Sequence, residues 1–524
     1  MLEQVKMCRK CGGDTFILHG RDRPSEGHPE GKRRHECVIC GHRTVNPYTT
    51  QPELSHLDRF VGSWDSEAPR HIITAAQNAT DVDLNFLKAL QVYTQEMEAS
   101  FSVIPFKYRN SSTNLTEPDQ GDDWWDGPIA DNLYSGRQNV GSHLTVLGDI
   151  PVTPTAVVPL SGLDSITGDR SGIVGHPKLE LKAIPMPQHK LPKIMATTGA
   201  ITLQNYTDSK SGKKGEFHHT MGAAVVEQDG EQFHLRQINA LLDGSFIDLD
   251  KRYTPKGVES VGGVEALVLG DLHVDYLDPD VVAATITNKD SMINLLKPKY
   301  VVLHDVIDFY SRGHHTRFDP FVGVAKQKDH MDDVFEEVAR ACKWVDMLPK
   351  DIRVVMVPSN HHDHMYRWMK ETDWRFDPVN AEMYLETALH MVRSAKMGTG
   401  GAEVADPFLF WAERLITTKD RCVFLKRDES FTLKGIELSM HGDIGANGAR
   451  ASKPGMARMG VKSILGHTHT PAIFEGAYWA GCMSVLRRDF NPGPSSWMNS
   501  NVVIYSNGKR SILNVLGQGR WRLA

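Results

Sequence analysis

The stretch SILGHTHTPAIF (residues 463–474) places two histidines, His467 and His469, directly after a short apolar run that predicts a buried strand. A histidine at a strand end is more often a satisfied polar residue than a metal ligand. Taken alone, the pair therefore favours a structural role. A functional role depends on whether other strands of the chain end in the same way.

Four further apolar runs, all after residue 260, end in similar polar clusters. The clusters are Asp271 and His273 in VEALVLGDLH, Asp305 and Asp308 in KYVVLHDVID, Asn360 and His361 in IRVVMVPSNHHDH, and His441 in GIELSMHGD. In open α/β sheets the carboxyl ends of buried strands converge on one crevice, so we expect these side chains to meet. Oxygen and nitrogen ligands without cysteine favour a pair of divalent cations such as Mn²⁺, Fe²⁺ or Zn²⁺.

The order of these blocks resembles the calcineurin-like metallophosphoesterases, whose pattern is D-x-H, GD-x-x-D, GNH-D/E, a later H, and GH-x-H. The resemblance implies a four-layer α/β/β/α sandwich with two catalytic cations. Mn²⁺ is the expected metal, and Fe²⁺ and Zn²⁺ are the alternatives. It assigns Asp271, His273 and His469 to one metal, Asn360, His441 and His467 to the other, and Asp305 to both. It also implies that His361 protonates the leaving oxygen while Asp308 holds its imidazole.

The sequence departs from this pattern at three positions. His304 stands where a glycine precedes the bridging aspartate, Ser359 replaces the glycine before Asn360, and His362 stands where an acid is expected. The ligands themselves remain in place. We therefore expect metal binding to be retained and the loop around the leaving group to differ.

Two CxxC pairs near the N-terminus predict a structural zinc ribbon with the ligands Cys8, Cys11, Cys37 and Cys40. Each pair forms a tight turn in which both thiolates can face one tetrahedral Zn²⁺, and a disulfide framework is the alternative. We expect a ribbon at residues 1–50, an α/β accessory domain at residues 51–260 and the metallophosphoesterase domain at residues 261–524. The accessory domain is expected to begin with a strand, a helix and a strand over residues 70–108.

The composition excludes some classes of protein. The 524 residues carry a net charge of -6, which argues against a polycation wrapped on nucleic acid but leaves room for local basic surfaces. The N-terminus lacks the apolar core of a signal peptide, and no apolar run reaches the length of a membrane span. We expect a cytoplasmic protein without membrane contact, and a homo-oligomer.

Three features favour DNA as the substrate: the zinc ribbon, the accessory domain, and the stretch GARASKPGMARMGVK (448–462), which has four cations and no acid. The candidates for binding phosphate are Arg312, His314, His315, Arg317, Arg450 and Lys453. The layout resembles the early Mn²⁺-dependent DNases of tailed phages, related to SbcD-type repair nucleases, and implies action in an infected bacterial cytoplasm. The alternatives are a phosphatase or small-nucleotide phosphodiesterase, and a DNA-binding protein with a non-catalytic metal scaffold.

Overall fold

The computed structural model describes residues 64–108, 125–187, 189–397, 405–488 and 491–523, together with short strands near the N-terminus. Those strands are β1 Val5–Lys6, β2 Phe16–Arg21, β3 Arg33–Cys37, β4 Arg43–Thr44 and β5 Tyr48–Thr49. Three of the four predicted zinc ligands, Cys8, Cys11 and Cys40, lie outside the described residues. The fourth, Cys37, is buried at the end of β3.

The expected strand, helix and strand are present at the start of the accessory region. Asp83 caps the helix by accepting hydrogen bonds from the amides of Asn85 and Phe86. The two strands pair in parallel and extend through a hairpin into a four-stranded sheet with the order β14-β13-β6-β7. The elements are β6 Arg70–Gln77, α1 Leu84–Glu96, β7 Ser100–Phe106, β13 Gly222–Asp229 and β14 Gln232–Asn239.

A six-stranded sheet forms the centre of the second half of the chain, with the order β21-β20-β19-β18-β27-β28. Its first four strands are parallel, β27 runs antiparallel to β18, and β28 runs antiparallel to β27. The strands are β18 Ala266–Val268, β19 Tyr300–Leu303, β20 Arg353–Met356, β21 Cys422–Phe424, β27 Ser500–Ile504 and β28 Arg510–Asn514. On one face pack α3 Pro279–Val282, α4 Met292–Leu296, α6 Val334–Met347, α7 Asn360–Glu371 and α9 Pro407–Leu415.

A ten-stranded sheet runs across both halves of the chain. Its junction is the antiparallel pair β11 and β25, in which Leu181 faces Ile473. From edge to edge the strands are β22 Thr432–Leu433, β23 Ile436–Glu437, β24 Ser463–Leu465, β26 Ala477–Trp479, β25 Ala472–Phe474, β11 Leu181–Ile184, β12 Lys193–Thr197, β10 Ser171–Val174, β9 Leu144–Leu147 and β8 Arg137–Val140.

One apolar core lies between the ten-stranded sheet and the two smaller sheets. Alternate residues of β18 divide between two cores: Val268 faces the ten-stranded sheet, whereas Leu267 faces the helices. A strand buried on both faces needs a continuous apolar run, as the sequence has. On the outer face of the ten-stranded sheet, α10 Lys453–Ala457 packs on Trp479.

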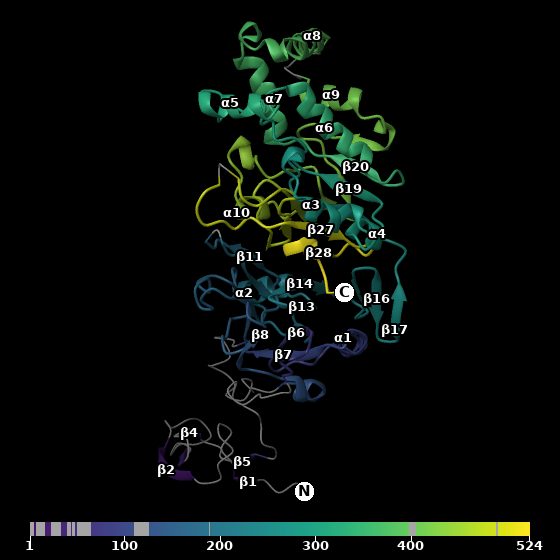
Figure 1. Ribbon diagram of the computed structural model, residues 1–524. Helices are drawn as coiled ribbons and strands as arrows, with labels where there is room; N and C mark the ends of the chain where they lie inside the picture. The colour runs from purple at the N-terminus through teal and green to yellow at the C-terminus, as the bar shows by residue number, and fades with distance from the viewer. Residues whose placement is uncertain are drawn as a thin grey trace.

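Figure 1 shows α5 to α9 at one end of the molecule and the β6 to β14 region toward the other. The remaining elements lie around these sheets: α2 Lys210–His218, β15 Phe246–Asp248, β16 Lys251–Thr254, β17 Gly257–Ser260, α5 Pro320–Lys328 and α8 Ala381–Met397. Within the described ranges, no helix is both long enough and apolar enough to cross a membrane.

Candidate metal centre

The five predicted strand ends meet between the two large sheets. β18, β19 and β20 belong to the six-stranded sheet, whereas β23 and β24 belong to the ten-stranded sheet. The convergence involves two sheets that share a core, and not the strand ends of one open sheet. The side chains nevertheless come together at the carboxyl ends of these strands.

The first group of side chains is fully buried and contains Asp271, His273, Asp305 and His469. The Nε2 atom of His273 lies 3.0 Å from Nε2 of His469 and 3.7 Å from Oδ2 of Asp305. The Nε2 atom of His469 lies 3.2 Å from Oδ2 of Asp271. Two carboxylates and two imidazoles thus surround one small space, as expected for a divalent cation.

The second group adjoins the first through Asp305, whose Oδ2 lies 3.1 Å from Nε2 of His441. The side-chain oxygen of Asn360 lies 3.1 Å from Nδ1 of His467, and the rings of His441 and His467 are 5.3 Å apart. Asp305 therefore contacts members of both groups. All seven predicted ligands lie within this one region.

The backbone is left-handed at four of these residues: φ is 46° at His273, 43° at Asp305, 68° at His467 and 53° at His469. This conformation is unfavourable for residues other than glycine and persists only where the surrounding structure enforces it. It turns the two histidines of the GHTH block in different directions. His469 contacts Asp271 and His273, whereas His467 contacts Asn360.

The Asp271 carboxylate lies among imidazoles and has no hydrogen-bond donor among the described residues. Burial raises the pKa of Asp271 to about 7, and neither of its carboxylate oxygens accepts a hydrogen bond from the described residues. Burial would also lower the pKa of His441, but the carboxylates of Asp305 and Asp271 raise it to about 9. Buried carboxylate oxygens without donors, next to imidazoles, are a donor set that fits divalent cations.

His361 lies at the start of α7, with its ring centroid 4.6 Å from that of His273. Its Nδ1 is 2.7 Å from the main-chain oxygen of Asp308. The Asp308 carboxylate lies 3.9 Å from the same Nδ1 and contacts His273 Nδ1 and Arg488 at 2.9 Å each. The carbonyl of Asp308 therefore orients His361, and its carboxylate orients His273.

Three residues near the site were not identified as functional from the sequence. His304, which replaces the expected glycine, is buried with its Nδ1 3.3 Å from Nδ1 of His441, and burial lowers its pKa to about 3. Its position directly before Asp305 was the available signal. Arg488 follows no motif, and His364 differs from its neighbours only by its spacing on α7.

The structure does not gather the predicted phosphate-binding residues at one place. Arg312 forms a two-point contact with Asp377 at 2.7 and 2.8 Å, and Arg317 pairs with Glu371. Arg450 is exposed, whereas the ammonium of Lys453 lies 5.9 Å from the Trp479 ring centroid. Burial lowers the pKa of Lys453 to about 8. His314 and His315 lie together beside His364.

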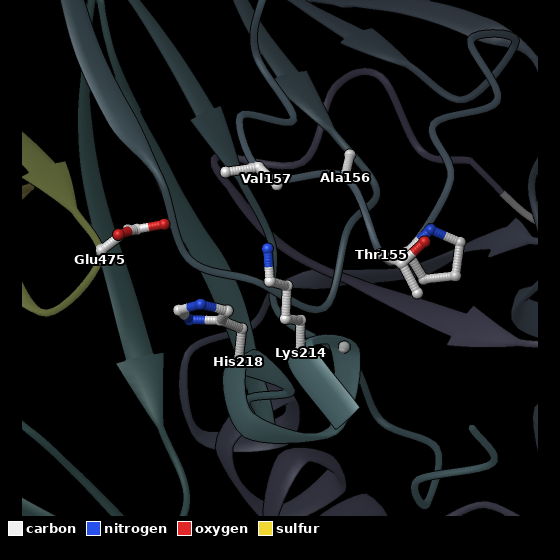
Figure 2. Close-up of a pocket in the computed structure, with 8 residues that line it drawn as sticks. Thr155, Ala156, Val157, Lys214, His218 and Glu475 are labelled. Atoms are coloured by element: carbon white, nitrogen blue, oxygen red, sulfur yellow. The ribbon is translucent and has the colours of Figure 1, made fainter. Parts of the chain in front are cut away.

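Two cavities outside the metal centre share His218 and Glu475 in their walls. The first, of about 220 Å³, lies between Lys214 and His218 of α2 and the loop through Thr155 (Figure 2). The second, of about 530 Å³, is lined by five cations and one acid: Lys178, Arg458, Lys462, Lys509, Arg510 and Glu475. The basic stretch 448–462 therefore does not lie wholly beside the metal centre. Lys462 comes just before β24, whereas the predicted ligand His467 comes after the other end of this strand.

Comparison with known proteins gives one close relationship. Over 473 residues the chain is 33% identical to Protein A1 of Escherichia phage T5, covering 87% of this chain and 83% of that protein. The chain belongs to the Protein A1 family. The expectation of a phage-type protein therefore agrees with this family. The assignment of this chain to the metallophosphoesterases stays a prediction.

Two other comparisons add nothing to this assignment. No protein-family model matches the chain. Vps29 of Chaetomium thermophilum, a solved structure, is 10% identical and covers 37% of this chain and 96% of its own, with a TM-score of 0.19. A likeness this low carries no argument about fold.

Proposed function

We propose that the chain is a two-metal phosphodiesterase of the calcineurin-like type that hydrolyses DNA. The observation that carries the proposal is the pair of adjoining ligand groups around Asp305, which is built from two sheets. Its aspartates and three of its histidines are buried, whereas Asn360 and His467 are only half-buried. Asp271, His273 and His469 would hold one cation, and Asn360, His441 and His467 the other, with Asp305 between them. When bound, two such cations supply Lewis acidity that activates water and offsets charge on the phosphate.

The protein's own residues would hold and move the proton in this reaction. Because Nδ1 of His361 is directed at the Asp308 carbonyl, its Nε2 is left to protonate the leaving oxygen of the phosphodiester. The ring of His273 is fixed through Nδ1 by the Asp308 carboxylate, which leaves Nε2 as the metal-facing nitrogen. Arg488 stabilises the charge of that carboxylate.

DNA is favoured over a small phosphoester by the basic surface near the centre. Exposed Arg450 lies in the loop that follows His441, where Ile444 and Arg450 form a β-bridge. The cavity lined by Arg458, Lys462 and Lys509 adds a second cationic region. Separated cationic regions suit a polyanion that follows the surface, because each neutralised phosphate releases counterions.

The direct test uses the full chain, freed of metal and reloaded with Mn²⁺. The substrates are linear duplex DNA, single-stranded DNA, an aryl phosphodiester and an aryl phosphomonoester. We expect Mn²⁺-dependent cleavage of DNA and of the aryl phosphodiester. Turnover of the monoester with DNA left intact would support the phosphatase alternative, and DNA binding without any turnover would support the scaffold alternative.

Two matched variants locate the activity. Asp305→Asn should abolish cleavage and reduce Mn²⁺ bound at both sites, because Asp305 contacts both ligand groups. Asp351→Asn makes the same change at an exposed turn before β20 and should behave as the wild type. Full activity in Asp305→Asn would refute the proposed centre.

A further inference from the structure

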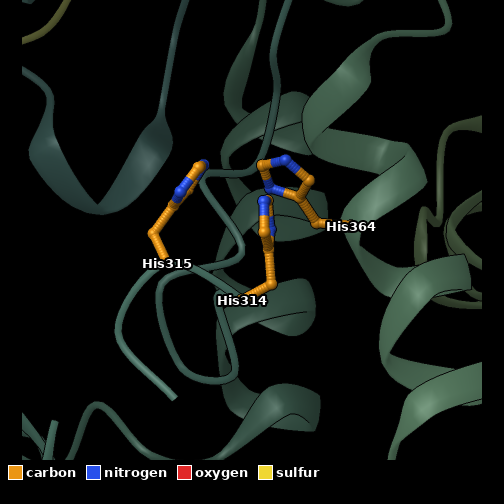
Figure 3. Close-up of side chains that lie close together, drawn as sticks. All are labelled: His314, His315 and His364. Atoms are coloured by element: carbon orange, nitrogen blue, oxygen red, sulfur yellow. The ribbon is translucent and has the colours of Figure 1, made fainter. Parts of the chain in front are cut away.

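Three histidines that the proposed centre does not use form a separate cluster. His314 and His315 lie in the loop after β19, and His364 lies on α7 (Figure 3). One ligand nitrogen from each lies within 4.8 Å of the other two. The ring centroid of His314 lies 3.8 Å from that of His315 and 4.6 Å from that of His364.

The loop that carries His314 and His315 is anchored on both sides of the cluster. Before it, the Glu337 carboxylate accepts hydrogen bonds from the amides of Tyr310 and Ser311 at 2.9 and 3.0 Å. After it, the ammonium of Lys326 donates to Thr316 Oγ1 at 2.8 Å. The loop therefore has contacts of its own that hold the two imidazoles near α7.

The helix that carries His364 is equally well fixed. Ser359 caps α7 by accepting a hydrogen bond from the amide of His362, and Met365 and Trp368 bury the helix in the core. His364 follows His361 by three residues, so the two side chains lie on the same face of the helix, with ring centroids 4.8 Å apart. The cluster thus adjoins the proposed general acid.

The chemistry of the cluster is that of neutral nitrogen donors. It contains three imidazoles and no carboxylate, and the buried Nδ1 of His314 has no hydrogen-bond partner among the described residues. Three imidazoles with a fourth position open to solvent are a typical donor set for Zn²⁺, and also suit Ni²⁺ and Cu²⁺. Mg²⁺ and Ca²⁺ prefer oxygen ligands, which this set lacks.

We propose that His314, His315 and His364 form a third divalent-cation site that prefers Zn²⁺ or another nitrogen-binding metal. The open position faces solvent beside exposed His315 and accepts water or a phosphate oxygen. Binding of the ion is independent of the proposed function. Only a role in holding a substrate phosphate near His361 rests on that function.

The test is Zn²⁺ binding to the metal-depleted full chain, measured by calorimetry and by metal analysis after dialysis. We expect His315→Ala and His364→Ala each to bind one equivalent fewer than the wild type. The matched control is His143→Ala, which removes another exposed histidine and should leave the stoichiometry unchanged. Because His315 is exposed, its loss should not unfold the protein, which circular dichroism checks.

Two further measurements separate this site from the other metal sites. Cu²⁺ bound at the cluster should add a separate component with nitrogen hyperfine coupling to the electron paramagnetic resonance spectrum of the wild type, and this component should be missing in His315→Ala. The Asp305→Asn variant should keep that signal, because the cluster does not include Asp305. Wild-type Zn²⁺ stoichiometry and Cu²⁺ signal in His315→Ala would overturn the third site while leaving the proposed function untouched.

Discussion

The substitution Gly466→Ala tests the metal centre by adding a single methyl group. Gly466 follows β24 directly, and a Cβ atom at this position would lie closer to Oδ1 of Asp271 than the 3.0 Å limit of real Cβ contacts. It would also lie 3.1 Å from Cγ of His304. The added methyl group therefore meets a predicted ligand and its neighbour at once.

Neither side of this contact can retreat easily. The Gly466 amide donates to the carbonyl of His441 at 2.8 Å. The Asp271 main chain is fixed by bonds to Gly481 and Met483 at 3.0 and 2.8 Å. The Asp271 carboxylate must then move by on the order of 1 Å, a misplacement that can cost about 10²-fold in rate. We expect metal affinity to fall by about 10- to 100-fold, or about 1.4 to 2.7 kcal/mol.

The assay is Mn²⁺ titration followed by calorimetry, with DNA cleavage measured at each Mn²⁺ concentration. The control is Gly323→Ala on α5, where an added Cβ would meet no atom within 4 Å. The Gly466→Ala protein should recover part of its activity at high Mn²⁺ concentration. Unchanged Mn²⁺ affinity in a folded Gly466→Ala protein would refute the placement of Asp271 in the centre.

Four more substitutions have defined outcomes. His361→Ala should slow DNA cleavage by about 10²- to 10⁴-fold at unchanged metal content, and cleavage of an aryl phosphodiester, whose leaving group needs no proton, should slow less. His362→Ala removes a ring stacked on Phe408, with ring centroids 4.1 Å apart, and should instead lower the melting temperature. Arg450→Ala should weaken DNA binding and reduce its salt slope by about one in fluorescence anisotropy, and an unchanged slope would exclude a phosphate contact. Burial raises the pKa of Glu337 to about 7, above its ordinary 4.5, so the folded state binds this proton more tightly than the unfolded state. The free energy of unfolding should therefore fall as pH rises from 4.5 to about 7. Glu337→Gln should remove that fall in urea denaturation, and a pH profile identical to that of the wild type would contradict this reasoning.

The strands that carry the site could be predicted because each is a short apolar run ended by polar residues. The strands β18, β19, β20 and β24 are buried on both faces, so their sequences are continuous apolar runs without alternating polar residues. The helix α1 was equally clear, since its apolar spacing starts directly after the capping residue Asp83. These signals are local, and each is complete within about ten residues.

The features that could not be predicted depend on contacts between distant residues. Nothing in β11 or β25 specifies that Leu181 faces Ile473, because strand pairing depends on the packing of both sheets. For the same reason the sequence does not specify which atom of Asp308 contacts His361. The chain direction after β19 decides whether its carboxylate or its carbonyl meets His361, and Phe309 continues that turn with φ at 58°.

The pairing of β11 with β25 also constrains how this protein can be made. The ribosome releases β11 long before β25, so half of the ten-stranded sheet must wait with an open edge for its partner. The last described residues close the structure late as well, since the amide of Leu523 donates to Glu227 of β13 at 2.9 Å. Contacts of such long sequence separation make folding slow. A nascent chain of this protein therefore remains open to aggregation and proteolysis until β25 and Leu523 have left the ribosome.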